Sequence, residues 1–316
     1  MLRSFPERSA AGSAESRAVW LDLSSPDDGE KRAVEQRFGI RIPDLAALRE
    51  IETSSRLRVD GKTLYMSAPL IAGINTGHWQ LAPAGFILTP DALVTVHYAE
   101  LAQFDAVEKA VRDTPDLTPA SALATLLEDI VDRAADHLEH ASEVISQASQ
   151  SLFFEDTFRS GLGRETRKIR EIMRNMGQAS DRASRVRYAF LSIGRMVSFV
   201  LDRCTPELDQ ALQDRFEALQ HDIASLDEFE TSLGGRIQLL QDAATAFISI
   251  EQNDVVKVLT VASVVGIPPV LVVGVYGMNF HVMPELGWPL GYPFALILCL
   301  LSALVPYLWF KWRDWI

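Results

Sequence analysis

Hydrophobic and polar positions divide the chain into three parts with different periods. Between about residues 18 and 98, short runs such as "KTLYMSAPLIAGI" and "ALVTVHY" favour strands, and turn signals such as Asp60-Gly61 and Pro90-Asp91 separate them. From Thr118 onward, long stretches of helical period follow. Roughly the last sixty residues are strongly apolar. The pattern predicts an α/β domain followed by long helices and two apolar C-terminal helices.

This pattern gives the following expected segments. They are a disordered N-terminal tail at 1–17, an α/β domain at 18–117, a helical region at 118–205, a stalk helix at 206–257, a first span at 258–276, a loop at 277–291, a second span at 292–310 and a C-terminal tail at 311–316. Within the α/β domain a helix is expected after Ser25, with Pro26 and the acids after it in the first turn.

The expected stalk carries a seam of apolar positions spaced alternately by four and three residues. The seam consists of Leu212, Phe216, Leu219, Ile223, Leu226, Glu230, Leu233, Ile237, Leu240, Ala244 and Phe247. This spacing is typical of a coiled coil between chains, with Glu230 as one polar interruption. An amphipathic helix packed on its own domain gives the same pattern, so the sequence leaves both interpretations open.

Two charge-free runs, at 258–276 and 292–310, approach the roughly 20 residues that cross a bilayer core. The stalk pattern enters the first run without a capping signal, so one continuous helix is expected. Lys257, Lys311 and Arg313 flank the outer ends of the two spans, whereas the loop between them has no basic residue. The positive-inside tendency then predicts a multi-pass membrane protein with both termini in the cytoplasm.

Charge and motifs exclude several classes of function. A net charge of −12 disfavours nucleic acid and favours divalent cations as partners. No nucleotide-binding, serine-hydrolase or zinc-protease motif occurs, so the chain is not expected to be an enzyme. Cys204 and Cys299 lack metal-ligand spacing. His137 and His140 could share a metal on one helix face, but a solvated face is the favoured interpretation.

One stripe of the first span is polar or small at helical spacing. Its members are Asn253, Val256, Thr260, Ser263, Ile267, Val270, Gly274 and Gly277. Two spans cannot enclose an aqueous pore, so such a stripe suits several copies facing one another. Alternatively, Thr260 and Ser263 bond back to carbonyls of their own helix.

The segment Tyr276-Gly277-Met278-Asn279, followed by Met283-Pro284-Glu285-Leu286 and a final span ending in basic and aromatic residues, resembles the CorA magnesium-channel family. The preceding "IEQNDVVKVLT" agrees in order and spacing, and the resemblance covers roughly the last eighty residues. It implies a homopentamer in the cell inner membrane and a chain in contact with lipid. It also favours the seam between chains and a pore along the stripe.

The resemblance also implies roles for individual residues. Gly277, Met278 and Asn279 form the selectivity filter, where neutral amides suit a cation that sheds water reluctantly. Glu285 adds a cation-attracting charge at the mouth, or is simply solvated. Asn253, Val256, Leu259, Thr260, Ser263 and Val270 line the pore and gate. Asn253 lies about 39 Å before Asn279 on a straight helix. Val256 stands where the family usually has methionine.

The resemblance further implies that Mg²⁺ is both the transported ion and a regulator bound at Asp242, with no organic cofactor. Influx of Mg²⁺ is expected, with passage of Co²⁺ and Ni²⁺. The alternative is a ZntB-like transporter of zinc or another divalent metal, since ZntB proteins share the architecture and the Gly-Met-Asn tripeptide. A membrane-anchored scaffold is a further class, but it would not require Gly277, Asn279 and the polar stripe together.

Overall fold

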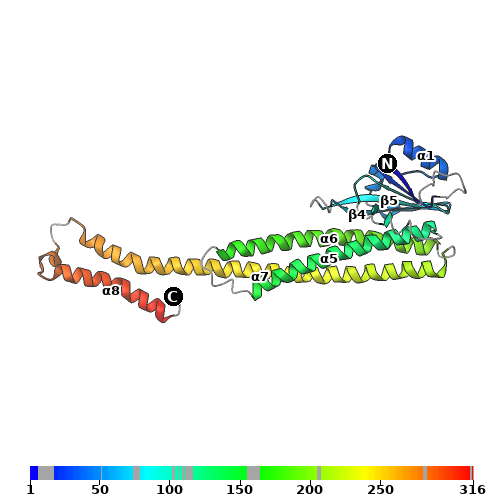
Figure 1. The fold of residues 1–316 in the computed structure, drawn as a ribbon. Coiled ribbons are helices and arrows are strands. Elements are labelled where there is room, and N and C mark those ends of the chain that lie inside the picture. The colour runs from blue at the N-terminus through cyan, green and yellow to red at the C-terminus, as the bar shows by residue number, and fades with distance from the viewer. Residues whose placement is uncertain are drawn as a thin grey trace. The chain divides into compact units, whose positions relative to one another are not determined.

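The computed structural model describes residues 1–5, 18–50, 52–73, 79–101, 104–105, 107–108, 111, 117–154, 164–204, 208–279, 283–313 and 315. These residues fall into two compact units (Figure 1). The first comprises residues 1–151 and 174–239, and it contains the sheet and most of a helical bundle. The second comprises residues 152–173 and 240–316, and it contains both apolar spans.

The first unit contains a six-stranded mixed sheet in the order β1-β2-β6-β5-β4-β3. The strands are β1 Leu2–Phe5, β2 Trp20–Ser24, β3 Leu57–Asp60, β4 Thr63–Ala72, β5 Gln80–Leu88 and β6 Leu93–His97. Neighbours are antiparallel except β2 and β6, which run parallel. Gly61 takes a positive φ of 60° in the tight turn between β3 and β4, as the Asp-Gly signal predicts. The strands expected between residues 18 and 98 are therefore confirmed.

Short helices accompany the sheet, and those whose bounds the described residues give are α1 Asp28–Phe38, α2 Leu45–Leu48 and α3 Thr53–Arg56. Asp27 and Glu30 form a reciprocal capping box at the start of α1. Pro26 therefore precedes the cap, so its expected place in the first turn is wrong. Val34 of α1 and Leu48 of α2 are buried in one cluster with β2, β5 and β6, so these helices cover part of the sheet.

The expected disordered tail is wrong at its start, because Leu2–Phe5 pair with β2 as an antiparallel edge strand. Phe5 is 2% exposed and its ring lies 4.8 Å from that of Trp20. The terminal ammonium also donates to the carbonyl of Ser24. Of the two apolar residues in this strand only Phe5 is buried, so pairing with β2 is what holds the strand in place. Residues 6–17 lie outside the described residues.

A buried polar network joins β2 to β6. The indole of Trp20 donates to Thr95, and the Thr95 hydroxyl donates to Asp22 over 2.6 Å. The Nδ1 atom of His97 lies 2.6 Å from the carbonyl of Ala99, so it carries a proton, while Nε2 lies 3.3 Å from Asp22. Burial alone lowers the pKa of His97, but the hydrogen bond and charge of Asp22 outweigh it and leave the pKa raised.

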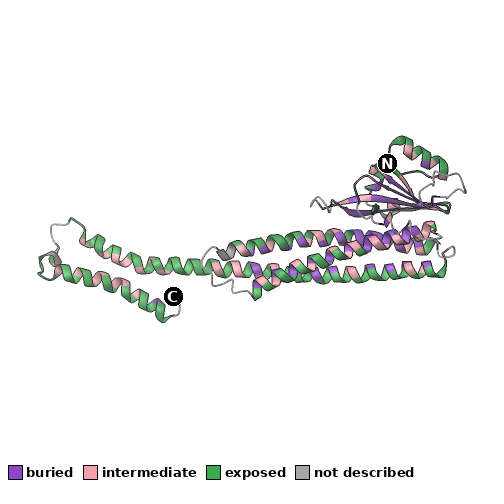
Figure 2. Ribbon diagram, viewed as in Figure 1, coloured by how far each residue is buried: buried purple, intermediate pink, exposed green. Residues whose placement is uncertain are grey.

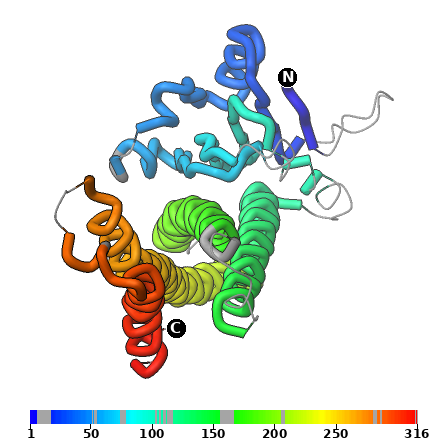
Figure 3. The backbone as a smooth tube through the Cα atoms, turned by 90° about the vertical axis from the view of Figure 1, so that its left-hand side faces the viewer, coloured from blue at the N-terminus to red at the C-terminus, as the bar shows by residue number. Residues whose placement is uncertain are grey.

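Three long helices follow, α5 Pro119–Phe153, α6 Arg164–Cys204 and α7 Gln210–Tyr276, which confirms the long helices expected after Thr118. Viewed along their axes they lie side by side (Figure 3). In the first unit, Arg215 of α7 bonds Glu128 of α5 through two nitrogens. Arg187 of α6 bonds Glu230 of α7 over 2.9 Å.

The seam of α7 packs inside its own chain, so the interpretation of a seam between chains is wrong. Leu212, Phe216, Leu219, Ile223, Leu233 and Ile237 are all buried in a single copy. A Cβ atom at Gly194 of α6 would lie 3.3 Å from Ile223, which shows how closely the two helices approach. Glu230 is tolerated in the seam because Arg187 pairs with it. A three-helix bundle repeats apolar residues as a coiled coil does, so spacing could not separate the two.

In the second unit, α7 continues without interruption into the first apolar span, as expected, and its 67 residues include Pro268 and Pro269. The second span is α8, Gly291–Trp312. Both helices are long and apolar enough to cross a membrane. Within the most apolar stretch of each helix, 0% of the stretch in α7 and 6% of the stretch in α8 is buried (Figure 2). A core helix of a soluble protein would be covered, so these two are membrane spans.

Candidate functional site

The end of α7 forms a tight turn at Gly277. The Gly277 amide donates to the carbonyl of Val273 over 2.8 Å, and the Met278 amide donates to that of Val275. A Cβ atom at Gly277 would stand 3.1 Å from the Val273 oxygen, closer than nearly all real contacts. Met278 is 48% exposed, and Asn279 is exposed as well. The turn thus leaves the Asn279 amide accessible beyond the end of the helix.

The loop after Asn279 returns through a single turn of 3-10 helix, η3 Pro284–Gly287. Residues 280–282 lie outside the described residues. Glu285 is half-buried, and its backbone carbonyl accepts from the amide of Trp288. A Cβ atom at Gly291 would lie 2.4 Å from that same carbonyl oxygen, so only glycine fits there. Sequence reasoning did not single out Gly291, although a glycine directly before an apolar run was a usable signal.

The two spans form the predicted hairpin. Trp315, three residues after the end of α8, lines a cleft with Asn253, Asp254, Val256, Lys257 and Thr260 of α7. The chain therefore returns to the level of Asn253 after α8. Lys257 and Asp254 form an ion pair of 3.1 Å beside this cleft. The charged residues that flank the spans thus lie at the same end of the hairpin.

The stripe predicted to line a pore is open in a single copy. Val256 is 60% exposed, Leu259 67% and Val270 72%. Asn253 and Thr260 are also exposed, whereas Ser263 is half-buried. Other positions of the span, including Val265, Val272 and Tyr276, are half-buried. One side of α7 therefore remains uncovered by its own chain along the whole span.

Thr260 and Ser263 bond back to their own helix, which was the plainer of the two interpretations. The Thr260 hydroxyl donates to the Val256 carbonyl over 2.7 Å, and the Ser263 hydroxyl donates to that of Leu259 over 2.8 Å. A hydroxyl that donates its proton keeps its lone pairs available. These bonds satisfy the hydroxyl protons within the helix and leave the lone pairs of the oxygens available as acceptors.

Asp242 is exposed on α7, eleven residues before Asn253 and so on nearly the same face. Among the described residues, no group of three or more His, Cys, Asp or Glu side chains could hold a metal ion. Asp242 is therefore not part of such a group within the described residues of its own chain.

The histidine pair of α5 does not gather further ligands in the described residues. The His137 ring lies edge-on to Trp79, with centroids 4.3 Å apart, and burial lowers the pKa of His137. His140 is exposed, and its Nδ1 atom lies 3.8 Å from Oε2 of Glu143. Cys204 and Cys299 do not form a disulfide with each other. The geometry therefore supports packing for His137 and solvent exposure for His140, and not a shared metal.

Comparison with known proteins agrees with this geometry. Residues 15–312 match the family model described as "CorA-like Mg2+ transporter protein". The chain is 31% identical over 301 residues to the "Magnesium transport protein CorA" of Escherichia coli (strain K12), covering 95% of this chain and 92% of that protein.

Two solved structures share the fold. The complete CorA magnesium transporter from Methanocaldococcus jannaschii matches with a TM-score of 0.74 at 18% identity, covering 98% of this chain and 94% of that one. The ZntB cytoplasmic domain from Vibrio parahaemolyticus RIMD 2210633 matches with a TM-score of 0.50 at 12% identity, covering 73% of this chain and 87% of that one.

The family model spans nearly the whole chain, and the fold agrees with it from the sheet to the second span. The members of this family are transporters and not enzymes, which confirms the expectation that this chain is not an enzyme. The chain belongs to the CorA family of Mg²⁺ transporters.

Proposed function

We propose that five copies of this chain surround a central pore and let Mg²⁺ enter the cell through it. The observation that carries the proposal is the uncovered side of α7, from Asp242 through Asn253 to Val270, which bears polar, small and modest apolar side chains. Copies that face one another would cover this side and leave an axis lined by it. The number of copies rests on the resemblance of the Gly-Met-Asn segment.

Asn279 is proposed to select the ion at the outer mouth, together with Gly277 and Met278. A ring of amides offers carbonyl oxygens that hydrogen-bond the water shell of Mg²⁺, and this ion is dehydrated only reluctantly. The tight turn at Gly277 supports this role because it keeps the amide exposed beyond the helix end. Glu285 contributes a weak attraction for cations near the mouth.

The gate is proposed to lie near the cytoplasmic end of the span. Val256 and Leu259 are exposed apolar side chains about one and about two turns after Asn253. Rings of such side chains close a pore by excluding water. Ile267, 60% exposed on the same stripe, would add a further apolar ring. Thr260, Ser263 and Val270 line the path between.

Asp242 is proposed to sense Mg²⁺ in the cytoplasm. Carboxylates that meet between copies repel one another until a divalent cation neutralises them. Bound Mg²⁺ would favour a closed, symmetric state, and its loss would let the stalks separate. Such a site shifts the balance only if the closed state binds Mg²⁺ more tightly than the open one.

We place the hairpin in the inner membrane with both termini in the cytoplasm, since basic residues flank only the outer ends of the spans. The same amides would admit hydrated Co²⁺ and Ni²⁺. Zinc transport is the less favoured function, because the likeness to the ZntB domain is one of fold, whereas curated relatives at 31% identity are magnesium transport proteins.

The test is Mg²⁺ uptake by the purified protein in lipid vesicles. Asn279→Ala should abolish uptake of Mg²⁺, Co²⁺ and Ni²⁺ while the mass of the assembly in detergent stays unchanged. An assembled Asn279→Ala protein with normal uptake would remove Asn279 from the filter. Light scattering of the unaltered protein should give five chains, and another number would contradict the proposed assembly.

A further inference from the structure

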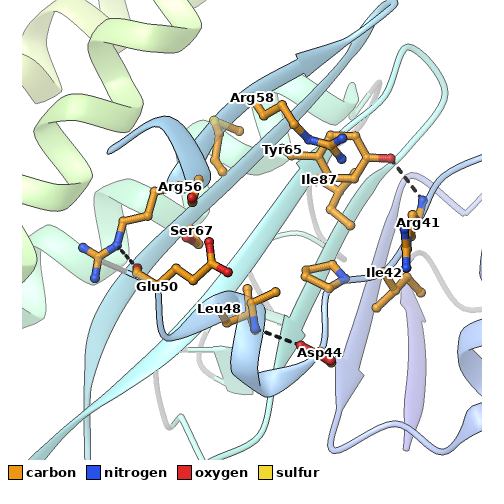
Figure 4. A pocket seen from close by; sticks show the side chains of 14 residues that line it. Arg41, Ile42, Asp44, Leu48, Glu50, Arg56, Arg58, Tyr65, Ser67 and Ile87 are labelled. Atoms are coloured by element: carbon orange, nitrogen blue, oxygen red, sulfur yellow. Dashed lines mark hydrogen bonds between the residues drawn. The ribbon is translucent and has the colours of Figure 1, made fainter. Parts of the chain in front are cut away.

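The first unit contains a cleft that shares no residue with the proposed ion pathway. It has a volume of about 500 Å³ and lies in the first unit, between α2, α3 and the β3–β4–β5 part of the sheet (Figure 4). This size falls in the range of small-molecule sites, about 300–1,000 Å³. All its lining residues come from residues 41–87 of one copy, so the site is complete within a single chain.

Part of the cleft is apolar. Ile42, Leu48, Met66 and Ile87 line it, and each is buried, with no more than 6% of its surface exposed. Leu48 comes from α2, Met66 from β4 and Ile87 from β5, so the sheet and the helix hold this surface rigidly. Such a surface can cover the flat face of a ring, as most small-molecule sites do.

Arg58 and Tyr65 form one wall of the cleft, and Arg41 also lines it. The Arg58 guanidinium lies over the ring of Tyr65, 4.3 Å from its centroid, and the Tyr65 hydroxyl accepts from the backbone amide of Arg41 over 3.1 Å (Figure 4). Both arginines are exposed, and within the described residues neither forms an ion pair with a carboxylate. The Tyr65 hydroxyl keeps its own proton for donation. This wall is therefore rich in hydrogen-bond donors.

A chain of net charge −12 repels anions as a whole, so an anion site needs local positive charge, which Arg41 and Arg58 supply in this cleft. Guanidinium groups match the oxygens of a phosphate in geometry as well as in charge. Opposite this wall the cleft offers acceptors, since Glu50 and Ser67 line it. The other acid, Asp44, already accepts from the amide of Ala47. The cleft thus combines a cationic wall, an apolar surface and a carboxylate that can receive hydroxyl or amino protons.

We propose that this cleft binds a phosphate-bearing small molecule with a flat ring, of the nucleoside diphosphate or triphosphate class. Its phosphates lie against Arg41, Arg58 and Tyr65, its ring on the apolar surface, and its hydroxyl or amino groups near Glu50.

The cleft is also connected to the helical bundle. Arg56, which lines it, donates to the carbonyl of Glu50 over 2.7 Å and to the hydroxyl of Tyr188 on α6 over 3.2 Å. The residue before Tyr188, Arg187, pairs with Asp227 and Glu230 of α7. A ligand that moves Glu50 or Arg56 would thus act on the helix that continues into the first span.

The experiment is calorimetric titration of the full-length protein in detergent, with ADP, ATP, pyrophosphate, inorganic phosphate and adenosine, in Mg²⁺-free buffer and again with excess Mg²⁺. We expect saturable binding of ADP and ATP in Mg²⁺-free buffer, weaker binding of pyrophosphate, and little binding of phosphate or adenosine alone. Binding should weaken as salt is added, because exposed charges are screened.

Arg41→Gln combined with Arg58→Gln should weaken ADP binding by about tenfold or more, since each charged hydrogen bond is strong. Arg32→Gln, an exposed arginine of α1 in the same unit, is the matched control and should bind as the unaltered protein does. Tyr65→Phe keeps the ring under Arg58 and removes only the hydroxyl, so it should weaken ADP binding less than the double arginine variant does. Circular dichroism verifies that each variant is folded.

Three outcomes would overturn the proposal. One is the absence of saturable binding by any phosphate compound in either buffer. Another is a folded Arg41→Gln/Arg58→Gln protein that binds ADP normally. The third is adenosine binding as tightly as ADP, which would leave the arginines without a role. Failure of Mg²⁺ uptake does not bear on this titration, so the two proposals fail independently.

Discussion

The sheet and the two membrane spans treat apolar side chains in opposite ways. Phe86, Leu70 and Ala84 at the centre of the sheet are each 0% exposed, whereas Val270 and Leu259 on α7 are 72% and 67% exposed (Figure 2). Both regions contain many apolar side chains, but the strands also carry charged residues such as Arg58 and Asp60, whereas the run at 258–276 carries none. The sheet is complete within one chain. The spans are left uncovered by their own chain, and in the proposed assembly lipid and further copies cover them.

The largest expected contrast comes from removing one side chain in each region. Phe86→Ala should lower the free energy of unfolding by about 3–5 kcal/mol, because it leaves a cavity in a closed core. Val270→Ala should change it by less than about 0.5 kcal/mol, because surface sites tolerate such changes. Urea unfolding of the detergent-solubilised protein, followed by far-ultraviolet circular dichroism, measures both. Equal losses would show that the spans carry a core of their own.

At Gly291 the hairpin leaves no room for an added side-chain atom, as in the closely packed sheet. Gly291→Ala would place a Cβ atom 2.4 Å from the Glu285 carbonyl, and backbone atoms must then move. We expect about 1–3 kcal/mol of destabilisation, as in other overpacked sites, together with reduced Mg²⁺ uptake. Gly287→Ala is the matched control, since a Cβ atom there would meet none of the described residues within 4 Å. Identical behaviour of the two variants would mean that the turn before α8 adapts freely.

Asp242 is exposed, and its proposed role is to bind regulatory Mg²⁺ between copies. Replacing it should therefore change inhibition by Mg²⁺ and leave the stability of the fold unchanged. Asp242→Ala should raise the cytoplasmic Mg²⁺ concentration for half-inhibition of current at least about fivefold, the lower end of typical coupling between sites. Unfolding and ion selectivity should stay unchanged. Asp222→Ala, also exposed on α7, is the control. Unaltered inhibition in Asp242→Ala would exclude it from the sensor.

The smallest effect concerns the buried network of the sheet. The raised pKa of His97 means that the folded state holds its proton more tightly than the unfolded state, whose pKa is about 6.5. This contribution is complete below that value and is lost as the pH rises through the folded pKa. His97→Gln should therefore flatten the fall of unfolding free energy above about pH 6.5. A slope as steep as that of the unaltered protein would contradict the charged pair with Asp22.

The long helices and spans could be predicted because their signals lie within continuous runs of sequence. The run at 258–276 is charge-free, and its length alone indicates a span. The strands after residue 18 likewise carry local turn signals. The edge strand at Leu2–Phe5 could not be predicted, since two apolar residues form a strand only when a neighbour such as Trp20 is present to pair with them.

The misinterpreted seam and the overlooked cleft have a common cause. Leu219 and Ile223 show only that one face of α7 is covered, and the spacing does not say whether the same chain or another covers it. Arg41, Arg58 and Tyr65 meet because the sheet brings β3 and β4 beside the segment before α2, which no local pattern records. The filter and pore residues were proposed from family resemblance, and their roles remain predictions.

The uncovered side of α7 is proposed to face an ion pathway. A thiol reagent dissolved in water should then reach a cysteine on this side during transport. In a background with Cys204→Ser and Cys299→Ala, cysteines are introduced singly at Thr260, which is exposed, and at Val265, which is half-buried on the other side of the helix. A small cationic thiol reagent should block Mg²⁺ uptake through the Thr260→Cys protein and leave that through Val265→Cys unchanged. Block at Val265→Cys without block at Thr260→Cys would contradict the account.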